Sequence, residues 1–134
     1  MKTKPVLTLE DVKKIAAAAE AEAVKNKWAV TISVVDDGGH LLWLQRMDGA
    51  APVSAWIGPQ KAITAAIGQR ESAVYEKMVN EGRVSFLAVS PVTPLEGGVP
   101  IIVEGFYVGA VGVSGVKSTE DVQIAKAGIA ALGL

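Results

Sequence analysis

His40, the only histidine of the chain, follows directly after the turn sequence DDGG at positions 36–39. Most histidines beside such a turn are simply solvated, but an imidazole is also suited to ligating a metal or a haem iron. Because the chain contains no cysteine, thiolate ligands, thiolate nucleophiles and disulfides are all excluded. His40 is therefore the candidate metal ligand, and a plain solvated turn residue is the alternative interpretation.

Three further charged side chains are candidates for meeting a polar ligand. Arg46 and Asp48 stand two residues apart at the end of a predicted strand, where they could orient each other as an ion pair or together bind a ligand. Lys61 lies among alanines and isoleucines of a predicted helix. A lysine in so apolar a helix either extends its amine to water or faces a pocket as a cationic anchor, and the sequence alone favours extension to water.

The segment Glu96-Gly97-Gly98 precedes Pro100 and suggests a backbone site for an anion. Two adjacent glycines can direct consecutive N–H groups into one concavity, which suits a carboxylate. Glu96 and Asp48 would then be the candidate general acid and base. The alternative is a simple turn into an edge strand, where Pro100 would protect the edge from pairing.

These candidates are positioned by the glycine-rich stretch 97–115, GGVPIIVEGFYVGAVGVSG. Between its glycines almost every residue is β-branched or aromatic, which predicts a hairpin with arms at 99–103 and 106–114 around a Glu104-Gly105 turn. Both faces of the second arm are apolar, so we expect an interior strand pair covered on both sides. Glycines inside that arm indicate a bulge or the close approach of a helix, a second subunit or a ligand.

The rest of the chain predicts a second hairpin and helices. Thr8 and Asp11 form a capping-box pattern that opens a helix ending near Asn26, and Ser118 with Asp121 forms another. The remaining expected elements are strands at 29–35 and 40–47, a helix at 54–69 that contains Pro59 or starts at it, a short polar helix at 70–83, an irregular segment at 85–96 and a last helix stopped by Gly133. This order predicts an α+β domain over residues 1–134, with a single antiparallel β-sheet flanked by helices.

Composition limits the partners. The 134 residues carry 13 basic and 14 acidic side chains without a basic block, which argues against nucleic-acid binding. No apolar run approaches the ~18 residues of a membrane span, so no membrane partner and a cytoplasmic location are expected. Half of the residues are hydrophobic and only 20% are charged, so we expect apolar surface to be buried between subunits of a homo-oligomer.

Four segments in this order resemble the GlcG/HbpS-like (haem-degrading) family: VVDDGGHLLWLQRMDGA, QKAITAA, the glycine-rich stretch and STEDVQIAKAG. The resemblance runs from about Leu9 to Leu132. It implies a profilin-like fold, dimers or larger rings such as octamers, and haem binding, with slow haem degradation in some members. Relatives occur fused to corrinoid adenosyltransferases and in operons for glycolate and aromatic-compound breakdown. The positions that match the family motifs are His40, Arg46, Asp48, Lys61, Glu96, Gly97, Gly98 and Pro100.

Two hypotheses follow. The first is a haem or tetrapyrrole site at a subunit interface, with His40 on the iron and Arg46 or Lys61 pairing with propionates. The remaining possible iron ligands are Met47, Met78, Tyr75 and Tyr107. Its apolar walls would come from Trp43, Trp56 or Phe106. The second is an enzyme or sensor for a small organic acid, in which Arg46, Lys61 and the Gly97-Gly98 amides bind a carboxylate and Asp48 or Glu96 moves a proton. A purely structural subunit remains a third alternative.

Overall fold

A computed structural model describes all residues, 1–134, as an α+β fold. Its elements are α1 (Leu9–Lys25), β1 (Thr31–Asp36), β2 (Leu41–Arg46), α2 (Ser54–Gly68), α3 (Ser72–Asn80), the 3₁₀ helix η1 (Val84–Ala88), β3 (Gly98–Val103), β4 (Phe106–Ser114) and α4 (Ser118–Ala130). The predicted single antiparallel sheet flanked by helices is confirmed. None of the helices is both long and apolar enough to cross a membrane.

The four strands are ordered β2-β1-β4-β3, so the two sequence hairpins meet through β1 and β4. β4 is interior, as its apolar faces predict, and it is buried from Val108 to Ser114. The expectation that both arms of the second hairpin are interior is wrong for β3, which is an edge strand. Pro100 within β3 is consistent with that position, since proline lacks the N–H that an additional strand would need.

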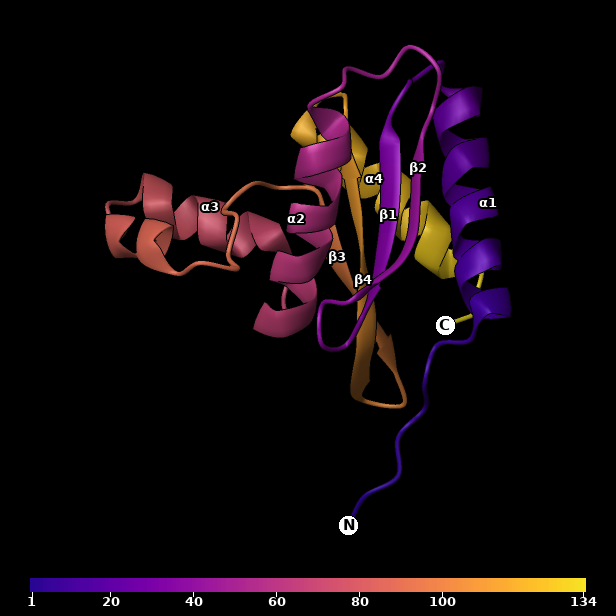
Figure 1. Cartoon of the computed structure of the whole chain (residues 1–134), viewed down its shortest axis with the longest axis horizontal. Helices are drawn as coiled ribbons and strands as arrows, with labels where there is room; N and C mark the ends of the chain where they lie inside the picture. The colour runs from indigo at the N-terminus through magenta and orange to yellow at the C-terminus, as the bar shows by residue number, and fades with distance from the viewer.

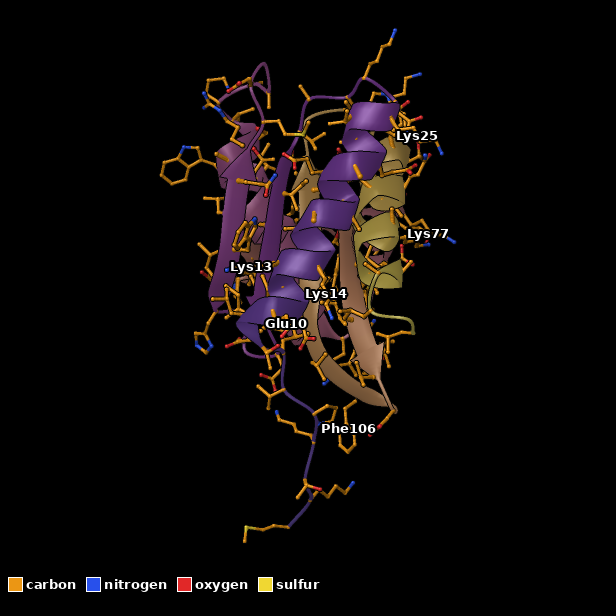
Figure 2. The ribbon with its side chains drawn as sticks, turned by 90° about the vertical axis from the view of Figure 1, so that its right-hand side faces the viewer. Glu10, Lys13, Lys14, Lys25, Lys77 and Phe106 are labelled. Carbon is orange, nitrogen blue, oxygen red and sulfur yellow. The ribbon has the colours of Figure 1, made fainter.

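Helices cover the two faces of the sheet unequally (Figure 1). α2 crosses one face, and α1 and α4 lie side by side on the other, as the turned view also shows (Figure 2). The larger apolar core lies between the sheet and α1 with α4, and is centred on isoleucines and valines such as Ile15, Ile32 and Ile124. The α2 side is thinner and rich in alanine, with Ala62, Ala65 and Ala66 against the sheet. α3 projects sideways from this α2 side, away from the sheet (Figure 1).

Helix α2 approaches β4 so closely that only glycine fits between them. A Cβ on Gly112 would lie 2.2 Å from the carbonyl oxygen of Gly58 and 2.5 Å from the amide nitrogen of Ala62. The predicted close approach to the glycines of this arm is therefore a helix. α2 begins at Ser54 and continues through Pro59, so Pro59 is not its start.

Local sequence signals account for the start of α1 and for the turn of the second hairpin. The capping box of α1 forms as predicted: the Asp11 N–H donates to the Thr8 hydroxyl at 3.1 Å and the Thr8 N–H donates to the Asp11 carboxylate at 2.9 Å. Glu104 and Gly105 both have positive φ, of 51° and 81°, in the two-residue turn of the second hairpin. The predicted Ser118–Asp121 box is wrong, because the Glu120 carboxylate instead accepts the Lys117 N–H at 3.2 Å.

Candidate functional site

His40 and Asp36 form a compact polar pair at the β1–β2 turn. The Asp36 carboxylate accepts the N–H groups of Gly38 and His40, each at 2.9 Å, and lies 3.0 Å from the His40 Nδ1 atom. Partial burial raises the pKa of Asp36, but the two N–H groups and the His40 ring outweigh it and lower that pKa below its ordinary value. The carboxylate is thus ionised at neutral pH and can only accept hydrogen bonds.

This pairing determines which imidazole nitrogen is available. Because an ionised carboxylate can only accept, the proton of a neutral His40 ring resides on Nδ1, and Nε2 keeps its lone pair. The side chain is 80% exposed, so Nε2 is open to a ligand. A carboxylate that holds Nδ1–H in this way is the usual support of a metal-ligating histidine.

Arg46 and Asp48 lie at the opposite end of β2 from His40. Both side chains are exposed, neither makes an ion pair, and together with Glu20, Gln45 and Met47 they line a shallow open depression. The ion pair, one of the two arrangements considered for Arg46 and Asp48, is therefore not formed. Arg46 remains free to meet an anionic group.

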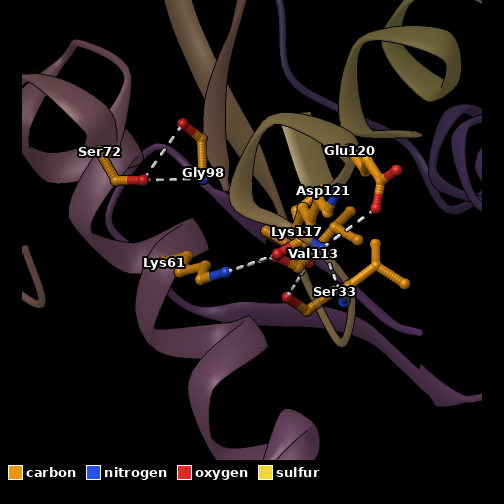
Figure 3. Close-up of polar contacts among 10 residues, drawn as sticks. Ser33, Lys61, Ser72, Gly98, Val113, Lys117, Glu120 and Asp121 are labelled. Carbon is orange, nitrogen blue, oxygen red and sulfur yellow. Dashed lines mark hydrogen bonds and ion pairs between the residues drawn. The ribbon is translucent and has the colours of Figure 1, made fainter. Parts of the chain in front are cut away.

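Lys61 does not extend to water, contrary to the sequence-based expectation. Its amine is buried, with 6% of the side chain exposed, and donates to Asp121 Oδ2 and to the carbonyl oxygen of Val113, each at 3.0 Å (Figure 3). Asp121 also accepts the Val116 N–H at 3.3 Å. Lys61 thereby connects α2 to the start of α4 around the end of β4, and its amine is engaged within the chain.

The two glycines predicted to bind an anion pack against this buried pair. The Gly98 N–H donates to the Ser72 hydroxyl at 2.8 Å (Figure 3). The Gly97 carbonyl accepts the Val113 N–H at 3.0 Å. A Cβ on Gly97 would lie 2.6 Å from the Lys61 amine, which explains the glycine. The Gly98 N–H therefore already has a hydrogen-bond acceptor within the chain. Binding of a carboxylate by the Gly97 and Gly98 N–H groups remains a prediction.

Asp48 and Glu96, the predicted acid–base pair, stand at opposite edges of the sheet. Asp48 follows β2 and Glu96 precedes β3, so two strands lie between them, a separation of about 14 Å at ordinary strand spacing. No cavity of the chain is lined by both. An apolar cavity of about 180 Å³ between the N-terminal segment and the second hairpin contains none of the predicted site residues.

Two site residues escaped sequence reasoning. Asp36 was recognised only as part of a turn, although an aspartate four residues before the single histidine could have suggested the pairing. Asp121 was assigned to a capping box because the Ser-x-x-Asp spacing fits that pattern. Nothing local indicated that Lys61, sixty residues earlier, would bind it.

The buried Asp121 makes the stability of the fold depend on pH. Burial raises the pKa of Asp121 to about 6, although Lys61 acts to lower it. A carboxyl whose pKa is raised on folding contributes stability below its unfolded pKa near 3.8, and that contribution is lost as the pH rises toward 6. Relative to Asp121→Asn, the wild type should lose about 2 kcal/mol between pH 4 and 7, as measured by urea unfolding. A pH-independent difference between the two proteins would contradict this assignment.

Comparison of the sequence with known proteins identifies the family of this chain. The family model described as "Haem degrading protein HbpS-like" matches residues 7–130. The chain is 54% identical over 114 residues to Protein GlcG of Escherichia coli strain K12, covering 85% of each protein.

Solved structures agree with the fold throughout its length. A double mutant of HbpS from Streptomyces reticuli superposes with a TM-score of 0.92 at 32% identity, covering 100% of this chain and 92% of that one. A structure described as a PduOC:Heme complex superposes with a TM-score of 0.87 at 27% identity, covering 95% of both chains. The protein is thus an α+β domain of the HbpS type, and the chain belongs to the HbpS-like family.

Proposed function

We propose that this protein binds haem or a related tetrapyrrole, with His40 Nε2 as the iron ligand. The observation that carries the proposal is the Asp36 carboxylate 3.0 Å from His40 Nδ1, which orients the ring so that the exposed Nε2 side faces a ligand. No group of three metal-binding side chains lies together in the chain. A haem site does not need one, since the macrocycle itself surrounds the iron and leaves only axial positions to the protein.

Other candidate groups of the proposed site lie away from His40, at the far end of β2 and on α2. Arg46 has a guanidinium free of ion pairs, which suits a propionate. Trp56 of α2 is 75% exposed and offers an apolar wall. Lys61 is unavailable for a propionate because Asp121 holds its amine.

Haem degradation and assembly are proposed from the similarity to related proteins. Bound haem would supply a redox-active iron. Haem degradation, named in the family description, predicts loss of the haem absorbance once a reductant and dioxygen are supplied. If the haem absorbance stays constant under those conditions, the protein binds haem without degrading it.

Assembly as a homo-oligomer, a dimer or more, and a cytoplasmic location remain predictions. The alternative of an enzyme or sensor for an organic acid gains no support from the structure of the single chain. Asp48 and Glu96 are separated by two strands, and the Lys61 amine and the Gly98 N–H already have hydrogen-bond partners.

Titration with haemin tests the proposal. We expect wild type to give a saturable red shift of the Soret band, and His40→Ala to lose that shift because the iron ligand is gone. Asp36→Asn should keep a ligand but bind about 10–100-fold more weakly, since the orientation and basicity of the imidazole change. Lys126→Ala, an exposed change on α4, is the control and should bind like wild type. Identical spectra for wild type and His40→Ala would refute iron ligation by His40.

A further inference from the structure

An apolar cavity lies outside the proposed haem site, between the N-terminal segment and the second hairpin. Its volume is about 180 Å³. Six of its eight lining residues are hydrophobic, and Asp11 is the only charged residue among them. The C-terminus lies close to the start of α1 (Figure 1), so both ends of the chain contribute to the walls of this cavity.

The walls of the cavity belong to the packed part of the fold. Val108 is buried in β4, and Leu7, Val103 and Leu132 pack against the larger apolar core. Leu7 is held especially closely, because its Cδ1 atom lies 2.8 Å from the position that a Cβ on Gly109 would take. The cavity is therefore preformed, as most sites for small molecules are.

Polar contacts at both ends of the N-terminal segment keep it in place beside the cavity. The Lys4 amine pairs with the Asp37 carboxylate in the β1–β2 turn, and the Thr8–Asp11 capping box fixes the segment to α1. Between these points Pro5 restricts the backbone. The segment thus borders the cavity without filling it, and the apolar lining lacks packing partners on its open side.

One carboxylate oxygen of Asp11 is free to meet a ligand. The N–H and the hydroxyl of Thr8 both donate to Oδ2, each at 2.9 Å, and no group of the chain donates to Oδ1. No basic side chain forms an ion pair with Asp11. The hydrogen bonds from the Thr8 backbone and side chain hold the pKa of Asp11 below its ordinary value, so the carboxylate is ionised at neutral pH.

We propose that this cavity binds a small amine with an apolar body the size of one aromatic ring, whose ammonium group donates to Asp11 Oδ1. An apolar cavity of about 150 Å³ is large enough for benzene, so about 180 Å³ holds one ring with a short substituent. An ammonium group supplies the counter-charge that Asp11 lacks, whereas an anion is repelled. A haem macrocycle contains four pyrrole rings and is too large, so this site is distinct from the proposed haem site.

Saturation-transfer NMR with three probes of similar size tests the proposal: benzylamine, benzyl alcohol and benzoate. We expect saturable binding of benzylamine, and about 3–10-fold weaker binding of benzyl alcohol, because a charge-assisted hydrogen bond is stronger than a neutral one. Benzoate should bind more weakly still. In Asp11→Asn the preference for the amine should disappear. Thr8→Ala disrupts the capping box but keeps the carboxylate, so this matched control should retain the preference.

A cavity-filling variant locates the site. Leu132→Phe adds a ring to the cavity lining and should abolish binding of benzylamine. Leu87→Phe, the same change at a position of η1 that is 62% exposed, should bind like wild type. Circular dichroism spectra check that both variants are folded.

Three results would overturn the proposal. If benzylamine does not bind to wild type, the chain ends or a second copy fill the cavity in solution. Binding that persists in Leu132→Phe would place the amine elsewhere, and equal affinity for benzylamine and benzoate would exclude a role for Asp11. None of these results bears on haem binding, because the haemin titration of wild type does not depend on this cavity.

Discussion

Replacing Gly112 with alanine is expected to destabilise the fold by about 3 kcal/mol or more. The added Cβ would lie 2.2 Å from the Gly58 carbonyl oxygen and 2.8 Å from the Ala62 side chain. The obstructing atoms are helix backbone, which cannot rotate away, so α2 would have to move off the sheet. Urea unfolding monitored by circular dichroism measures the loss.

Gly58→Ala is the matched control on the other side of the same contact. Its Cβ would meet Thr31 at 3.4 Å and Ser33 at 3.6 Å, which are ordinary contacts. Alanine is favoured over glycine inside a helix by about 1 kcal/mol, but a Cβ directly before Pro59 disfavours helical backbone and offsets that gain. This variant should therefore lose much less stability than Gly112→Ala. Equal losses for the two variants would mean that α2 does not lie as close to β4 as described.

Lys61→Ala is expected to cost about 3–5 kcal/mol at pH 7, because it leaves the buried Asp121 carboxylate without its counter-charge. The loss should shrink toward pH 4, where Asp121 is protonated and needs no partner. Lys126→Ala, which removes an exposed pair with Glu71 at 3.5 Å, should change the unfolding free energy by less than about 1 kcal/mol.

Removing both charges together distinguishes the electrostatic contribution of the ion pair to stability from the contribution of side-chain packing. The double variant Lys61→Met, Asp121→Leu should recover most of the stability lost in Lys61→Ala, since no unpaired charge remains buried. If the double variant is as unstable as Lys61→Ala at both pH values, the loss arises from packing, and the electrostatic account of this pair is wrong.

Periodicity and turn chemistry predicted the elements well because both are local. The Thr8 capping box, the Glu104-Gly105 turn and the alternation in β1 each depend on residues within a few positions of one another. The residues of β3 carried two conflicting indications. Pro100 indicated an edge strand, which is correct, whereas the apolar residues of the hairpin suggested an interior one.

The site was harder to predict because its contacts are distant in sequence. Lys61 and Asp121 are sixty positions apart, and a lysine in an apolar helix gives no sign of which carboxylate it meets. The separation of Asp48 from Glu96 likewise depends on strand order, which hairpin patterns leave open. By contrast, His40 could be singled out directly, since the chain offers no other imidazole and no thiolate.

A crystal structure of the haemin complex tests the central claim most directly. The account predicts iron bonded to His40 Nε2, with Asp36 still holding Nδ1 at the β1–β2 turn. Haem bound instead in the apolar cavity between the N-terminal segment and the second hairpin, with His40 facing solvent, would contradict it.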